Sequence, residues 1–168
     1  MLAAVTLIQM KVTPVIAIHI PFGGDNHTDV GLAAETAQTV AGVATIAALM
    51  QQLATAGLSD QVSLVTLNVF GRTIGPGNTG GRQHNQNHQV SLTIGKPFKG
   101  GIIGGVAPVQ GDYGAVAIDS KTGLASANGD VRPIATLASY GQTILASVGV
   151  SPSIISSDIS TVIAGALA

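Results

Sequence analysis

The sequence predicts an α/β fold with a doubly wound, mostly parallel sheet flanked by helices. Two apolar runs rich in β-branched residues, 13–20 and 61–70, are typical of strands buried on both faces. Between them, residues 30–56 repeat apolar side chains at helical spacing. The order strand, helix, strand predicts a right-handed crossover between parallel strands. The 168 residues are long enough to bury a core, and we expect one α/β domain over residues 1–168.

The first predicted strand and helix surround a glycine-rich loop. Residues 13–20 end at Pro21, and the loop Phe-Gly-Gly-Asp-Asn-His follows. His19 lies inside the apolar run, so we expect an interior or sheet-end histidine rather than a metal ligand. The helix over residues 30–56 is expected to stop at Gly57, because glycine is the usual residue just beyond a helix end.

The middle of the chain predicts shorter strands and one long loop. Residues 61–70 form the second predicted strand, and residues 71–87 follow without periodicity and with few large apolar side chains. A connection of this length in a compact domain is usually functional or disordered. We expect a third strand at residues 90–94, a tight glycine-rich turn or bulge at 100–105, and a short strand over 113–119 that pairs with it.

The C-terminal part predicts two helices. The first covers residues 132–148 and has Gly149 as its C-cap. Ser157 and Asp158 are the expected N-cap of a short last helix that runs to Ala168. Neither helix carries an obvious catalytic residue.

Composition excludes several functions. Charged residues form 9% of the chain, against about a quarter in ordinary soluble domains, and the net charge is −1. No basic patch is available for nucleic acid. The first ten residues lack a basic n-region, so no signal peptide is predicted, and the apolar runs are shorter than the ~20 residues of a membrane span. The charge-poor composition favours a periplasmic or extracellular assembly, with self-association or another protein chain as partner.

All four histidines lie in or next to two glycine-rich segments. Asp25 and His27 are two residues apart, and His84 and His88 would share one face if their segment were helical. These four side chains are the candidate ligands of one divalent metal. Nitrogen and oxygen donors without thiolate suit zinc, manganese or iron, whereas calcium is disfavoured by the small number of carboxylates.

A second interpretation of the same loops stays open. Asparagine, aspartate and histidine in glycine-rich loops also hydrogen-bond the backbone and hold turns. Arg72, directly after the second predicted strand, is a candidate to hold an anion through two parallel hydrogen bonds, or to pair with Asp25. Arg82 is the other candidate anion-binding residue.

The ordered motifs resemble a bacterial family, the domain-of-unknown-function 1501 family, which is related to sulfatases and alkaline phosphatases. That family reads Gly-Gly-Trp-Asp-Thr-His, then Glu-Phe-Gly-Arg-Thr, then Gly-Arg-Asp-His or Gly-Thr-Asp-His, then Lys-Gly-Gly. The corresponding segments here are Phe22-Gly-Gly-Asp25-Asn-His27, Asn68-Val-Phe-Gly-Arg72-Thr73, Gly80-Gly-Arg-Gln-His84-Asn and Lys99-Gly-Gly.

The resemblance implies a partial alkaline phosphatase-like α/β sandwich with a metal site at its strand ends, often in proteins exported by the twin-arginine route. Asp25, His27 and His84 fall on metal-ligand positions of that family. Gln83 stands where a second metal would have an aspartate, and Val69 replaces a glutamate. The chain corresponds to the C-terminal part of such a domain, and the missing N-terminal part would supply the nucleophile.

Two functional hypotheses follow. The first is a sulfatase/alkaline phosphatase-like domain with a degenerate or mononuclear metal site, which is not a complete hydrolase by itself because it lacks an attacking residue. The second is a non-catalytic structural or interaction subunit of an exported assembly, in which the histidine loops are stabilised turns.

Overall fold

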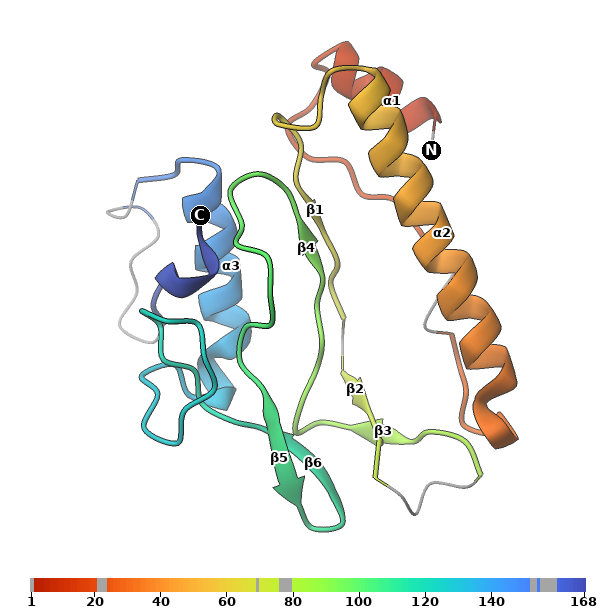
Figure 1. Ribbon diagram of the computed structural model, residues 1–168, viewed down its shortest axis with the longest axis vertical. Helices are drawn as coiled ribbons and strands as arrows, with labels where there is room; N and C mark the ends of the chain where they lie inside the picture. The colour runs from red at the N-terminus through yellow and green to blue at the C-terminus, as the bar shows by residue number, and fades with distance from the viewer. Residues whose placement is uncertain (1, 21–23, 69, 76–79, 152–153, 155–159) are drawn as a thin grey trace. The chain divides into compact units, whose positions relative to one another are not determined.

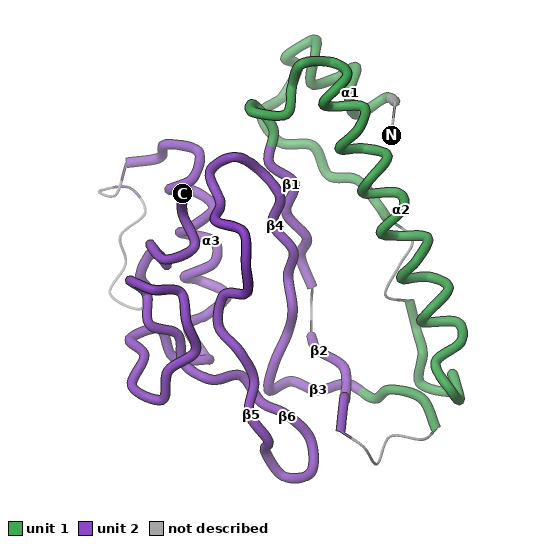
Figure 2. The backbone as a smooth tube through the Cα atoms, in the orientation of Figure 1, with its two compact units in different colours: residues 1–62, 79–83 green, residues 63–78, 84–168 purple. Residues whose placement is uncertain are grey.

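The computed structural model describes residues 2–20, 24–68, 70–75, 80–151, 154 and 160–168. The elements in chain order are α1 (Leu2–Gln9), η1 (Val30–Leu32), α2 (Ala33–Thr55), β1 (Leu64–Val65), β2 (Gly71–Arg72), β3 (His84–Asn85), β4 (Thr93–Ile94), β5 (Val106–Val109), β6 (Asp112–Ala115), η2 (Pro133–Ala135), α3 (Thr136–Ser147) and η3 (Ala164–Ala166) (Figure 1). They fall into two compact units, residues 1–62 with 79–83 and residues 63–78 with 84–168 (Figure 2).

The predicted doubly wound parallel sheet is wrong. Among the described residues, β1 pairs with β4, β2 with β3 and β5 with β6, each as an antiparallel two-stranded sheet. The chain is therefore a mixture of helices and short antiparallel pairs, and it is not alkaline phosphatase-like. Within the described residues of the predicted strand 61–70, the strand is β1 alone, and β2 begins after the predicted end.

The first predicted strand is also wrong. Residues 13–20 lie outside every described strand, and Val15 is 77% exposed. His19, expected in the interior or at a sheet end, is likewise exposed in this segment. A run of β-branched residues favours a strand, but the strand forms only where a neighbouring strand pairs with it.

The predicted helix over residues 30–56 is confirmed as η1 followed by α2. The carboxylate of Asp29 accepts the backbone N–H groups of Ala34 and Glu35 at 3.1 and 2.8 Å, which satisfies two donors of the first turn. At the other end Gly57 has φ +71°, and its N–H bonds to the carbonyl of Ala54 while the next N–H bonds to that of Leu53. These two backbone hydrogen bonds form the Schellman motif, in which glycine is the favoured residue.

The core of the first unit is formed by α1 and α2, which contact each other. The buried residues of the two helices are Ala4, Val5, Gly42, Ile46, Leu49 and Leu53. Within the described residues, the segment Val30–Thr55 is also long and apolar enough to cross a membrane, with a mean hydropathy of 1.3 over its most apolar window. Of that window, 17% is buried. A mostly buried core helix and a signal sequence near the N-terminus pass the same test, so length and composition give one weak candidate span where the sequence predicted none.

Short strands and turns precede the core of the second unit. The predicted strand 90–94 is reduced to β4, whose Ile94 is paired with Leu64 of β1. The predicted pairing of segment 113–119 with residues 100–105 is wrong for its first part, which belongs to β6 and pairs with β5. Only the N–H of Val116 bonds to a residue of that turn, the carbonyl of Gly105.

The core of the second unit joins Ile118, Val131 and Ile163, with Ala166 packed against them. The predicted helix 132–148 is confirmed as η2 and α3, and it ends at Gly149 with the same pair of backbone bonds as α2. Ser157 and Asp158 lie outside the described residues. In the described part of the last predicted helix, the helical element is the 3-10 turn η3.

The side of α3 that is buried is polar. Ser139, Gln142 and Thr143 are the buried residues of this helix, and Ser139 is fully inaccessible. The hydroxyl of Ser139 accepts the N–H of Thr161 at 3.2 Å, and that of Thr143 accepts the N–H of Ile163 at 2.9 Å. These bonds fasten the C-terminal segment to the helix.

Candidate functional site

The first histidine loop is held as a turn by its own side chains. Asp25 accepts the backbone N–H of His27 at 3.2 Å, and its carboxylate also contacts Nδ1 of the same imidazole. Asn26 is buried and donates its side-chain amide to Glu35 of α2. The loop is therefore fixed from both sides, and a carboxylate on Nδ1 sets the orientation of the ring.

Arg82 and Gln83 fasten residues 80–83 to this loop within the first unit. Nε of Arg82 lies 3.0 and 3.1 Å from the two carboxylate oxygens of Glu35, and its backbone N–H donates to the carbonyl of Asn26. The side-chain amide of Gln83 donates to the carbonyl of His27 at 3.3 Å. Arg82, a predicted anion-binding residue, is thus ion-paired, and Gln83 holds backbone at the position where the resembled family has an aspartate.

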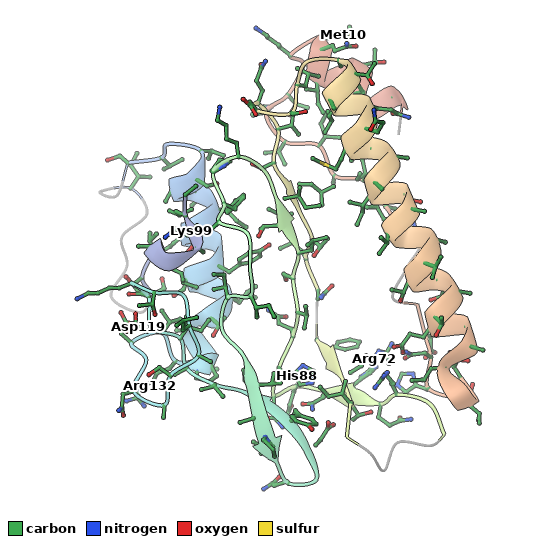
Figure 3. All side chains as sticks on the ribbon, in the orientation of Figure 1. Met10, Arg72, His88, Lys99, Asp119 and Arg132 are labelled. Atoms are coloured by element: carbon green, nitrogen blue, oxygen red, sulfur yellow. The ribbon has the colours of Figure 1, made fainter. Side chains whose placement is uncertain are left out.

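The second unit brings Arg72 and His84 together. They are register partners in the β2–β3 pair, so their side chains leave the same face of the ribbon. The ring of Phe70 lies 4.0 Å from that of His84, centroid to centroid, and Cζ of Arg72 lies 5.3 Å from the centre of the Phe70 ring. Arg72 is labelled in Figure 3. The arrangement combines a guanidinium and an imidazole around one aromatic ring.

His88 lies in a different environment from His84. His84 is exposed on β3, whereas His88 is buried and no described residue bonds to either of its ring nitrogens. The segment that joins them is a strand and a turn, so the expected helical pairing of these two histidines is not formed. A Cβ on Gly71 would lie 2.8 Å from Nδ1 of His88, so the ring packs directly on β2.

A polar hollow of about 320 Å³ lies where β3 meets the β5–β6 hairpin. Its lining residues are Thr73, His84, Asn85, Gln86, Asn87, Val109, Gln110 and Asp112. Asp112 accepts the N–H of Ile74 at 2.9 Å, that of Gly75 at 2.8 Å and the amide of Asn85 at 3.1 Å. These bonds, led by the N–H of Ile74, hold the pKa of the Asp112 carboxyl below its usual range. Sequence reasoning missed Asp112, because its partners lie 27 to 38 residues away.

The predicted metal ligands divide between the two units. Asp25 and His27 belong to the first, and His84 and His88 to the second. Within the described residues no three histidine, aspartate or glutamate side chains gather as a metal site would need. Neither unit alone assembles the four ligands among its described residues, so the single divalent metal, zinc, manganese or iron, stays a prediction of the sequence.

Comparison of the chain with known protein families, with curated proteins and with solved structures gave no match. The resemblance of the ordered motifs to a sulfatase-related family therefore stays an expectation. Of the residues behind that resemblance, Phe22, Gly23 and Val69 lie outside the described part of the chain.

Proposed function

We propose that the chain binds an anionic oxygen group, of the kind that phosphate and sulfate esters carry, at the face of β2–β3 formed by Phe70, Arg72 and His84. The observation that carries the proposal is the register of Arg72 with His84. A guanidinium presents parallel N–H donors that match the oxygens of a phosphate or sulfate, and the imidazole adds a further donor from the opposite strand.

The aromatic ring supports this role. Phe70 contacts the imidazole of His84 and lies under the guanidinium of Arg72, so both donors are restricted before a ligand arrives. Restricting side chains in advance lowers the entropy that binding must remove. The sulfatase-like and phosphatase-like motifs that include Arg72 and His84 support the same class of ligand.

The proposal covers binding and not a complete hydrolytic cycle. Hydrolysis through a covalent intermediate needs a nucleophile beside a base, and Phe70, Arg72 and His84 supply no hydroxyl or thiol nucleophile. The chain is thus proposed to bind an anionic oxygen group on the β2–β3 face, without the alkaline phosphatase-like fold that the motifs implied.

Calorimetric titration of the full chain with inorganic phosphate and with sulfate tests the proposal. We expect Arg72→Gln to weaken binding by about 10-fold or more, because a charge-assisted hydrogen bond is lost. Arg72→Lys should keep part of the affinity, since lysine retains the charge but not the parallel donors. Arg132→Gln removes an exposed guanidinium of the same unit and is the matched control. If Arg72→Gln and Arg132→Gln weaken binding equally, the loss of affinity follows from the change in net charge, and the proposed site is contradicted.

A second candidate function is a non-catalytic interaction subunit. It is favoured by the large apolar side chains that the units leave exposed, including Val40 and Val43 on α2 at 65% and 57%. Charged residues that would keep such a surface monomeric are scarce, at 9% of the chain. Light scattering of the purified chain over a range of concentrations tests this candidate, and a monomer at every concentration would contradict it.

A further inference from the structure

Helix α3 is oriented with its polar side inward and its apolar side outward. While Ser139, Gln142 and Thr143 are buried, four large apolar residues along the same helical segment are exposed: Ile134 at 95%, Leu137 at 54%, Leu145 at 43% and Val148 at 65%. With Gly141 between them, they form the α3 stripe, Ile134, Leu137, Gly141, Leu145 and Val148. Leu137, Gly141 and Leu145 lie in α3, and at about 100° per residue they fall within an arc of about 80°. Ile134 in η2 and Val148 at the C-cap of α3 extend the stripe at its two ends.

The glycine at position 141 also indicates a contact on this side of α3. It lies in the middle of α3, where glycine costs about 0.5–1 kcal/mol relative to alanine. A Cβ at this position would meet nothing within 4 Å, so the described packing of the chain does not require the missing side chain. A glycine that is unfavourable for the helix, and that the described residues of the unit do not need, favours the close approach of a backbone from a second copy of the chain.

The stripe is symmetric about this glycine. Leu137 and Leu145 lie four residues to either side of Gly141, and Ile134 and Val148 lie seven residues to either side. If two copies cross antiparallel at Gly141, each leucine meets the other leucine of the partner, and each Ile134 meets a Val148. A two-fold interface requires this kind of self-complementarity.

The distribution of charged residues around α3 is also compatible with an antiparallel contact between two copies of the helix. Arg132, labelled in Figure 3, lies nine residues before Gly141, so the antiparallel pairing places it at the C-terminal end of the other helix. That end carries the negative pole of the helix dipole and attracts a cation. Residues 133–151 contain no charged side chain, so like charges do not oppose the contact.

We propose that the α3 stripe is the contact surface of a homodimer, in which two copies of α3 cross antiparallel at Gly141. The partner is a second copy of this chain, and the pairing predicts which residues meet across the two-fold axis.

Sedimentation of the full chain over a concentration series tests the proposal. We expect a dimer for the unchanged chain, and a dissociation constant raised by about 100-fold or more in Leu137→Lys and in Leu145→Glu, because each leaves a charge unpaired at the interface. Ile102→Lys changes an 84% exposed apolar residue of the same unit that lies outside α3, and it should leave dimerisation unchanged. Circular dichroism confirms that each variant is folded.

Mixing the two charged variants decides the pairing. Residue 137 of one chain meets residue 145 of the other only in the antiparallel arrangement, so Leu137→Lys mixed with Leu145→Glu should restore a heterodimer. Gly141→Ala provides a test free of charge: it should raise the thermal stability of the dilute monomer and raise the dimer dissociation constant about tenfold. A monomeric parent, a dimer indifferent to these changes, or a mixture that stays monomeric would overturn the proposal.

Discussion

The imidazole of His88 packs on the backbone of Gly71, so that a side chain at position 71 has no room. A Cβ there would lie 2.8 Å from Nδ1 of His88 and still closer to the His88 carbonyl oxygen. Because Gly71 is also the β2 partner of Asn85 in β3, this contact fixes how the turn after β3 returns to the ribbon. The position of His84 and Arg72 on the ribbon depends on that local packing.

Substitution of Gly71 tests the contact. We expect Gly71→Ala to lower the free energy of unfolding by about 2–3 kcal/mol, because the added methyl overlaps backbone atoms that cannot move independently. Gly100→Ala is the control, since a Cβ at Gly100 would meet nothing within 4 Å. Urea denaturation measures both. A Gly71→Ala protein as stable as the Gly100→Ala protein would contradict the close packing.

His88 offers a separate prediction. In the part of the chain that the structure describes, its two ring nitrogens have no hydrogen-bond partner, and such buried polar atoms contribute no stabilising bond. His88→Leu should therefore keep the free energy of unfolding within about 1 kcal/mol of the parent, whereas His88→Ala should lower it by about 2 kcal/mol through the cavity it leaves. An equal loss in both variants would show that an imidazole nitrogen bonds to a group outside the described residues.

The lowered pKa of Asp112 leads us to expect that the free energy of unfolding of the second unit falls at acid pH. Its pKa is lowered in the folded chain, first by the N–H of Ile74 and then by that of Gly75 and the amide of Asn85. A depressed carboxyl pKa stabilises the fold fully above the ordinary value of 3.8, and the contribution is lost as pH falls through the lower folded value. We expect Asp112→Asn to lose less stability than the parent between about pH 5 and pH 2. Equal losses in urea denaturation across this range would contradict the assignment.

The predicted metal is tested by elemental analysis of the purified, chelator-treated chain after equilibration with zinc, manganese or iron. The sequence predicts about one equivalent in the parent and none in the His27→Ala, His84→Ala double variant. His19→Ala, an exposed histidine outside the predicted ligand set, is the control. Absence of metal from all three proteins would leave the loops as turns held by bonds such as that of Asp25 to His27.

The candidate site was only partly predictable. The sequence singled out Asp25, His27, Arg72, Arg82, His84 and His88 from glycine-rich segments. It did not predict that Arg82 pairs with Glu35, or that Phe70 lies between Arg72 and His84. Those relationships join residues that belong to different local segments, and residue type alone does not identify which carboxylate a guanidinium meets.

The sequence by itself determined α2 and α3 and their glycine endings at Gly57 and Gly149, because a helix is built from contacts three and four residues apart and its end from a few adjacent groups. Only the tertiary structure decided the strands. The apolar run 13–20 has no partner strand among the described residues. The strands that do pair include β2 and β3, which place Arg72 opposite His84. Strand pairing depends on segments distant in the chain, so an apolar pattern sets the tendency to form a strand but not its partner.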